Sequence, residues 1–140
     1  MIGASKFFLD SNVWLHSMME QDDQKMVAAK KLIDKLSSEI CLTSQIVNEV
    51  CVNLRRKVAI TESQIQMING SFYMNLTVLA IDESHLLKAS KIRNNGSFSY
   101  WDSLIVACAL AMNAEILYSE DMQDGFVVEN RLTIVNPFRF

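Results

Sequence analysis

Residues 6–15 read KFFLDSNVWL, a strand-like run followed at once by a helix-like one. The apolar residues up to Leu9 are typical of a short buried strand, and those that follow at helical spacing predict a helix. Ser11 or Asn12 is expected to cap that helix, because short polar side chains satisfy the free backbone N–H groups of its first turn. Asp10 stands at the junction and could be a turn residue, a cap or something more.

The same alternation of strand and helix continues along the chain. Further strands are expected at 39–43, 76–81, 115–119 and 132–135, and helices at about 26–36, 44–54, 61–74, 83–93 and 99–112. The last of these helices is apolar nearly all round, which indicates burial on several sides. The connections are too long for hairpins, so we predict an α/β fold with a mostly parallel central sheet and helices on both faces, a three-layer α/β/α arrangement.

Length and composition favour a single domain spanning residues 1–140. Half of the residues are hydrophobic and 21% are charged, which is enough apolar material for a core. No linker or internal repeat divides the chain. The apolar run at 104–112 is much shorter than the roughly 20 residues that span a membrane, and the first residues lack the apolar segment of a signal peptide. We therefore expect a cytoplasmic protein without a membrane partner.

The cysteines and histidines do not form the pattern of a metal site. Cys41, Cys51 and Cys108 are odd in number and lie in apolar stretches, so we expect reduced, buried thiols. His16 and His85 lack partners at zinc-binding spacing, and structural or surface roles are expected for both. A glycine-rich phosphate-binding loop is also missing from the sequence.

Four acidic residues stand at strand ends or on helices that follow strands. Asp10 and Asp121 come after predicted strands, Asp102 opens a helix, and Glu49 lies on a helix beside its apolar stripe. In open α/β sheets, ligands bind beyond the carboxyl ends of the strands, where the strand order reverses. If the strands before Asp10 and Asp121 are neighbours at that point, all four carboxylates can share one crevice.

Four clustered carboxylates require a cation. Two unit charges about 4 Å apart repel by about 4 kcal/mol at an effective dielectric constant of about 20. Taken singly, each acid has an ordinary interpretation: a turn or cap residue for Asp10, part of a capping box for Asp102, an acidic turn for Asp121 and a surface residue for Glu49. Taken together, a set of hard oxygen ligands without histidine or cysteine predicts a site for Mg²⁺ or Mn²⁺.

The segments around these acids resemble a PIN-domain ribonuclease, and most of all the toxin of VapBC-type toxin–antitoxin pairs. They are FLDSNVWL at 8–15, IVNEV at 46–50, YWDSLIVA at 100–107 and LYSED at 117–121. Their order and spacing fit that family across nearly the whole chain. The resemblance implies a PIN-like fold and an endoribonuclease that hydrolyses RNA phosphodiester bonds with Mg²⁺ or Mn²⁺.

The resemblance also assigns roles to individual residues. The implied catalytic and metal-binding acids are Asp10, Glu49, Asp102 and Asp121, with Asp10 and Asp102 as the chief ligands. The implied supporting residues are Asn12 and Ser119, together with Asp124, which could ligate, assist or cap a turn. Candidates for contacts to RNA phosphates are Arg55, Arg56 and Lys57, which follow Glu49 along its helix.

The charge balance has to be reconciled with an RNA substrate. Sixteen acidic and thirteen basic residues give a net charge of −3, whereas phosphate backbones favour cationic surfaces. With the four candidate ligands neutralised by metal, the bases outnumber the remaining acids by one. Two further basic clusters, at 30–35 and 88–93, are interpreted as solvated helix faces.

Membership of a toxin pair would imply a homodimer and a small antitoxin protein whose C-terminal segment occupies the acidic crevice. Two alternatives stay open: an RNA-processing PIN nuclease outside any toxin pair, and a degenerate PIN module that binds RNA or a partner without cleavage. Haloacid-dehalogenase and response-regulator folds also place an aspartate after the first strand. The former needs a second aspartate where this chain has Asn12, and the latter needs a late-strand lysine that does not stand out.

Overall fold

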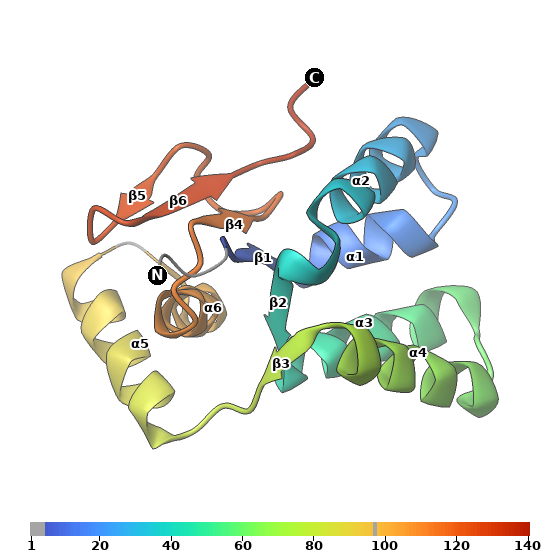
Figure 1. The fold of residues 1–140 in the computed structure, drawn as a ribbon, viewed down its shortest axis with the longest axis horizontal. Coiled ribbons are helices and arrows are strands. Elements are labelled where there is room, and N and C mark those ends of the chain that lie inside the picture. Colours follow the sequence, from blue (N-terminus) through green and yellow to red (C-terminus); the bar gives the residue numbers. More distant parts are fainter. Residues whose placement is uncertain (1–4, 97) are drawn as a thin grey trace.

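The computed structural model describes residues 5–96 and 98–140, which form a sheet covered by helices on both faces (Figure 1). The sheet has six strands in the order β3-β2-β1-β4-β6-β5. Every pair of neighbours is parallel except β5 and β6, which are antiparallel. The predicted α/β class with a mostly parallel sheet is therefore confirmed.

The strands are short and lie where apolar runs predicted them. Their bounds are β1 Phe7–Leu9, β2 Ile40–Thr43, β3 Thr77–Leu79, β4 Ile116–Tyr118, β5 Val127–Val128 and β6 Leu132–Val135. The sequence did not predict β5, because two residues are too few to show an alternating pattern. It follows the polar segment after β4 and pairs with β6 through Val127 opposite Thr133.

The helices also match the expected segments. Their bounds are α1 Ser11–Met18, α2 Asp23–Leu36, α3 Ser44–Val58, α4 Glu62–Asn75, α5 Glu83–Asn95 and α6 Tyr100–Ala111, with a short 3₁₀ turn, η1, at Ser37–Glu39. Helices α1 to α4 lie on one side of the sheet, and α5 and α6 lie on the other (Figure 1). This division follows from right-handed crossovers, since the chain builds β2 and β3 on one side of β1 and then returns to place β4 on the other.

Helix α6 is central to the core, as its apolar sequence predicted. Residues 103–110 are all buried, and they pack against the sheet and against α5. Buried side chains from both layers of helices join the strands in a single hydrophobic cluster. The burial of these residues therefore anchors the helix that carries Asp102 in its first turn.

Side-chain caps begin most of the helices. Thr43 and Ser99 each accept a backbone N–H of the first turn, and Thr61 with Gln64 forms the predicted capping box. The expectation that Ser11 or Asn12 caps α1 is wrong. Both lie inside the helix, and Asp10 is the cap, with its carboxylate accepting the N–H of Ser11 at 2.7 Å.

The cysteines and His85 have the structural positions that the sequence predicted. The three thiols are free and buried, and burial raises the pKa of Cys41 to about 11 and that of Cys108 to about 12. The Nδ1 atom of His85 accepts the backbone N–H of Asp82 at 2.9 Å, which completes the start of α5. None of the helices in the described residues has the length and apolar character needed to cross a membrane.

Candidate active site

The strand order reverses between β1 and β4, and Asp10 and Asp121 lie at that junction. These two strands are hydrogen-bonded neighbours, with Leu9 opposite Tyr118. The backbone N–H of Asp10 continues the ladder to the carbonyl of Tyr118 at 3.0 Å. Asp10 and the segment from Ser119 to Asp121 thus leave the sheet side by side at its carboxyl edge, which meets the condition that the sequence had left open.

Asp10 is the buried centre of this group, with only 5% of its surface exposed. One carboxylate oxygen accepts the N–H of Ser11, and the other accepts the hydroxyl of Ser119 at 2.8 Å. Burial raises the pKa of Asp10 to about 6 against the pull of these hydrogen bonds. The negative charges of Glu49 and Asp102 raise it further, so these two carboxylates lie close enough to act on Asp10.

Asn12 and Ser119 connect Asp10 to Asp121. The amide nitrogen of Asn12 lies 3.2 Å from Oδ2 of Asp121 and 3.5 Å from Oδ2 of Asp10, while its oxygen accepts the N–H of Glu120 at 3.2 Å. The hydroxyl of Ser119 donates to Asp10 and accepts the N–H of Asp121 at 3.3 Å. Two neutral side chains therefore hold two carboxylates at one strand junction.

Glu49 and Asp102 approach from helices α3 and α6, and both are half-buried. Glu49 lies in the second turn of α3, where Gln45 donates to its Oε1 at 3.2 Å. Asp102 lies in the first turn of α6, and its own N–H is capped by Ser99 at 3.1 Å. The positive end of that helix favours a carboxylate at this place.

Asp102 and Asp121 line the same small cavity. It has a volume of about 120 Å³, and its other lining residues are Phe98, Met122, Gln123 and Phe126. Asp121 is exposed at its mouth. The cavity gives these two carboxylates an opening to solvent.

The donor set suits an oxygen-preferring divalent cation. Within residues 5–96 and 98–140, no three His, Cys, Asp or Glu side chains are already arranged as a metal-binding group. Like-charged carboxylates separate when nothing neutralises them. The raised pKa of Asp10, caused by burial and by facing charges, marks a place where a cation would be stabilised. The carboxylates that would hold it are those of Asp10, Glu49, Asp102 and Asp121, a set typical of Mg²⁺ or Mn²⁺.

The model of the PIN-domain family matches residues 7–124 of this sequence. The chain belongs to the PIN-domain family. PIN domains are generally nucleases, and they generally use divalent metals. No curated protein matches the sequence.

Solved structures share this PIN fold at low sequence identity. A toxin–antitoxin complex from Klebsiella pneumoniae has a TM-score of 0.72 at 16% identity, covering 97% of this chain and 100% of that one. FitAcB from Neisseria gonorrhoeae has a TM-score of 0.70 at 18% identity, covering 96% and 99%. VapC20 from Mycobacterium tuberculosis, a sarcin-ricin loop cleaving toxin, has a TM-score of 0.65 at 13% identity, covering 80% and 87%. At these identities the likeness shows the fold.

Asp124 has partners of its own in this PIN domain. One of its carboxylate oxygens accepts the backbone N–H of Asn136 at 2.7 Å, and the other pairs with Arg139 at 3.2 Å. Both oxygens are therefore engaged with the C-terminal segment. Of the three roles considered from the sequence, this geometry matches a residue that closes a turn.

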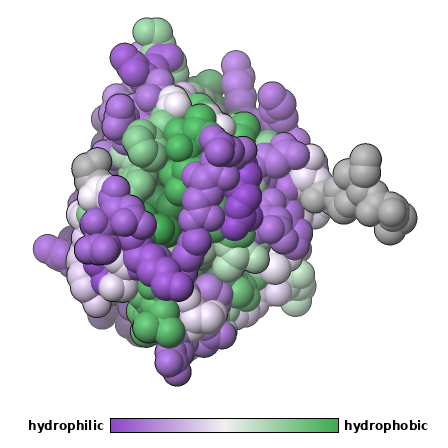
Figure 2. Space-filling view, turned by 90° about the vertical axis from the view of Figure 1, so that its left-hand side faces the viewer, coloured by the Kyte–Doolittle hydropathy of each residue, from purple (hydrophilic) through white to green (hydrophobic). Residues whose placement is uncertain are grey.

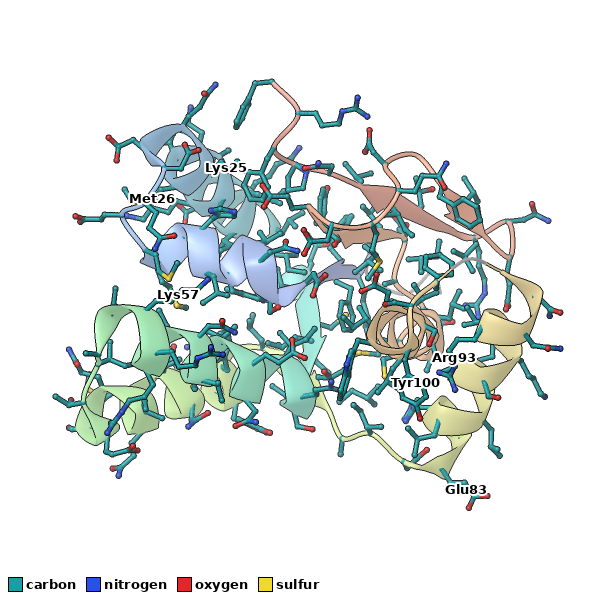
Figure 3. All side chains as sticks on the ribbon, turned by 180° about the vertical axis from the view of Figure 1, so that it is seen from behind. Lys25, Met26, Lys57, Glu83, Arg93 and Tyr100 are labelled. Atoms are coloured by element: carbon teal, nitrogen blue, oxygen red, sulfur yellow. The ribbon has the colours of Figure 1, made fainter. Side chains whose placement is uncertain are left out.

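The basic cluster on α3 lies in its last turn. Arg55 pairs with Glu62 of α4 at 3.0 Å, whereas Arg56 and Lys57 are exposed. Six residues separate Glu49 from Arg55, which is about 9 Å along a helix axis. Figure 3 shows Lys57 at the end of α3 that points away from α5 and α6.

Several residues of the site surroundings had not been identified from the sequence. Gln45 could have been found, because it precedes Glu49 by one helical turn and so lies on the same face. No sequence pattern identified Phe126, because it follows a polar segment without strand-like alternation. Arg93 was interpreted as part of a solvated helix face, and that interpretation is wrong for this residue. Its guanidinium lies 4.0 Å from the ring centre of Tyr100 and donates to Ser103, so it fixes the start of α6 (Figure 3).

An ionic cluster lies next to the site. Glu120 pairs with Lys25 of α2 at 2.6 Å and with His16 of α1 at 3.1 Å. His16 also packs edge-on against Phe138. The residue between Ser119 and Asp121 is thus tied to two helices and to the C-terminal segment, which gives His16 a structural role.

Proposed function

We propose that this PIN domain is a Mg²⁺- or Mn²⁺-dependent endoribonuclease. The observation that carries the proposal is the buried carboxylate of Asp10, which faces the charges of Glu49 and Asp102 at the reversal point of the sheet. A buried carboxylate that faces two other negative charges lowers the stability of the fold as long as no cation neutralises it. The carboxylate of Asp10 is suited to holding a divalent cation beside a solvent-open cavity.

A divalent cation bound there would supply an activated water and neutralise charge on the leaving oxygen of a phosphodiester. Asp10 and Asp102 are the proposed chief ligands, and Glu49 and Asp121 complete the set. Ser119 and Asn12 keep the carboxylates of Asp10 and Asp121 oriented, as their hydrogen bonds indicate. Asp10 has no freedom to rotate, because hydrogen bonds engage both of its oxygens.

Contacts to the RNA backbone are proposed for the last turn of α3. Arg56 and Lys57 are exposed there, and Arg55 would first have to leave Glu62. Charge reversal of Arg56 and Lys57 is expected to weaken RNA binding and to reduce its salt dependence. Unchanged binding with the same salt slope would remove these residues from the proposed interface.

The decisive experiment is cleavage of labelled structured RNA by the purified chain, with Mn²⁺ or with a chelator. Asp10→Asn and Asp102→Asn are carried through the same preparation to expose contaminating nuclease. Glu115→Gln is the matched control, since this carboxylate lies at the opposite end of β4 and, within the described residues, accepts a hydrogen bond from Ser5 alone. Cleavage that needs Mn²⁺ and both aspartates but not Glu115 is expected. Equal cleavage by all variants would contradict the proposal.

We further propose that the nuclease is a cytoplasmic toxin, a homodimer that is silenced by a small antitoxin. The support is the fold likeness to proteins solved as toxin–antitoxin complexes. Induced expression in a bacterial host should stop growth for the wild type and not for Asp102→Asn. Light scattering of the purified chain measures the oligomer. Growth unaffected by the active enzyme would favour an RNA-processing role outside a toxin pair.

A further inference from the structure

A second groove adjoins the acidic cavity on the α5 side of the molecule. It lies between α5 and the β5 edge and has a volume of about 340 Å³, within the roughly 300–1,000 Å³ of small-molecule sites. The two cavities share two lining residues, Phe98 and Phe126. A bound polymer that leaves the acidic cavity along Phe98 and Phe126 therefore enters the groove.

The shared wall is aromatic. The rings of Phe98 and Phe126 lie 5.6 Å apart at right angles, so one presents its face where the other presents its edge. Phe126 is 37% exposed although phenylalanine is usually buried, and Val127 beside it is 50% exposed. The floor of the groove is formed by the buried side chains of Ile92 and Val128.

Lysines border this apolar surface. Lys88 and Lys91 of α5 both line the groove. Lys88 pairs with Glu129 at 2.5 Å, and Lys91 is exposed and has no ion pair within the described part of the chain. Figure 2 faces this side of the molecule and shows hydrophobic side chains in the middle of the face with hydrophilic ones around them. The cluster at 88–93 is thus more than a solvated helix face.

We propose that this groove binds one unpaired nucleotide of the RNA substrate, next to the bond that is cut. The inference rests on the proposed nuclease function. An extruded base can stack on Phe126 and contact the apolar floor, while Lys91, which has no ion pair in the described part of the chain, neutralises the adjoining phosphate. A base inside a duplex cannot do so, because both of its faces are already stacked. The substrate class is therefore single-stranded or looped RNA.

The continuity of the two cavities favours RNA over a protein segment as the occupant. The wall that holds the base is the same wall that borders Asp102 and Asp121, so base and scissile phosphate belong to one strand. The exposed cation of Lys91 beside an apolar floor matches a nucleotide, which carries one phosphate for each base. A protein segment in the groove is the alternative that the experiment must separate.

The test is binding of a single-stranded RNA 10-mer that carries 2-aminopurine at each position in turn, with Ca²⁺ in place of Mn²⁺. Quenching of 2-aminopurine reports stacking on an aromatic ring, and anisotropy of an end label reports affinity. Phe126→Ala is expected to weaken binding about 5- to 150-fold and to abolish quenching at one position, since stacking of one base contributes about 1–3 kcal/mol. Phe126→Tyr should retain both signals and verify that the loop folds.

Matched variants separate the groove from general effects. Phe140→Ala removes another exposed aromatic ring and should leave binding unchanged. Lys91→Gln should reduce the salt slope of binding by about 0.7, whereas Lys31→Gln on α2 should not change it. A duplex of the same sequence should bind several-fold more weakly to the wild type and equally to wild type and Phe126→Ala.

Three results would overturn the inference. The first is that Phe126→Ala binds RNA within twofold of the wild type and still quenches 2-aminopurine. The second is that the wild type shows no preference for unpaired over duplex RNA. The third is that the wild type does not bind RNA at all. Loss of a protein partner by Phe126→Ala with RNA binding intact would make the groove a protein-docking site instead.

Cleavage assays run in parallel keep the two proposals distinct. Mn²⁺-dependent cleavage unaffected by Phe126→Ala would leave the nuclease standing, and groove-dependent binding without cleavage would remove only the nuclease.

Discussion

Ser119 of the β4 end donates its hydroxyl to Oδ2 of Asp10, the residue that follows β1, at 2.8 Å with both side chains buried. The serine lies 109 positions along the chain from the carboxylate that it orients. Its oxygen also accepts the N–H of Asp121, so a single hydroxyl sets the positions of two acids. The site is therefore sensitive to a neutral residue that would not bind the metal itself.

Replacing Ser119 by alanine should lower Mn²⁺ affinity or cleavage rate about 10- to 100-fold, the usual effect of losing a partner that orients a metal ligand. Isothermal titration with Mn²⁺ measures the affinity. Ser17→Ala is the control, because it also removes a serine hydroxyl, one that donates to the carbonyl of Trp14. Mn²⁺ affinity equally reduced in both variants would show a general loss of stability and would refute the positioning role of Ser119.

Without metal, the stability of the wild type should fall as the pH rises from about 4 to about 6. The pKa of Asp10 is about 6 in the fold against an ordinary value of 3.8, so the folded state keeps a proton that the unfolded state has lost. At 1.36 kcal/mol per pH unit this difference corresponds to about 3 kcal/mol. Urea unfolding of wild type and Asp10→Asn in chelator, from pH 4 to pH 7, measures it. A stability difference that is independent of pH would contradict the prediction.

Divalent cations should stabilise the fold. Mn²⁺ at about 100 times its dissociation constant should add about 2.7 kcal/mol, because it binds the native state only. Thermal unfolding with and without Mn²⁺ shows the effect as a rise in Tm that Asp102→Asn should lose. Glu115→Gln should behave like the wild type. An equal rise in Asp102→Asn would place the cation elsewhere on the protein.

Asp124 should prove dispensable for the chemistry. Its oxygens are engaged with Asn136 and Arg139, so Asp124→Asn is expected to keep Mn²⁺ affinity and cleavage within about threefold, with less than about 1 kcal/mol lost from stability, as for an exposed ion pair. Arg139→Ala should have the same small effect on stability. Asp121→Asn, tested beside it, should reduce activity strongly. A large loss of Mn²⁺ affinity in Asp124→Asn would return this residue to the metal site.

Much of the fold could be predicted because local signals agreed. Short apolar runs alternate with segments that begin at cap residues such as Thr61 and Ser99, and the resulting crossovers define a parallel sheet. The candidate metal-binding acids were identified mainly by their positions after strands, and less by their residue type alone. Asp10 and Asp121 follow the two strands that turned out to be neighbours.

Other parts of the site depend on contacts that no local pattern reveals. The partners of Asp124 lie 12 and 15 residues further along the chain. Phe126 is placed by the pairing of β5 with β6, and β5 is too short to be recognised as a strand. The cap of α1 was assigned to the wrong residue because Asp10, Ser11 and Asn12 are all good caps, and only the backbone conformation selects among them.

The sheet of this molecule ends in two very small edges. One border strand, β3, has three residues and the other, β5, has two. An incoming extended peptide would find only a few unpaired backbone groups on either border, too few to add a strand of useful stability. Binding by strand addition is therefore expected to be weak in this protein. A protein that binds this domain is therefore expected to recognise side chains on helix surfaces and cavity walls, where single substitutions can change specificity without disturbing the sheet.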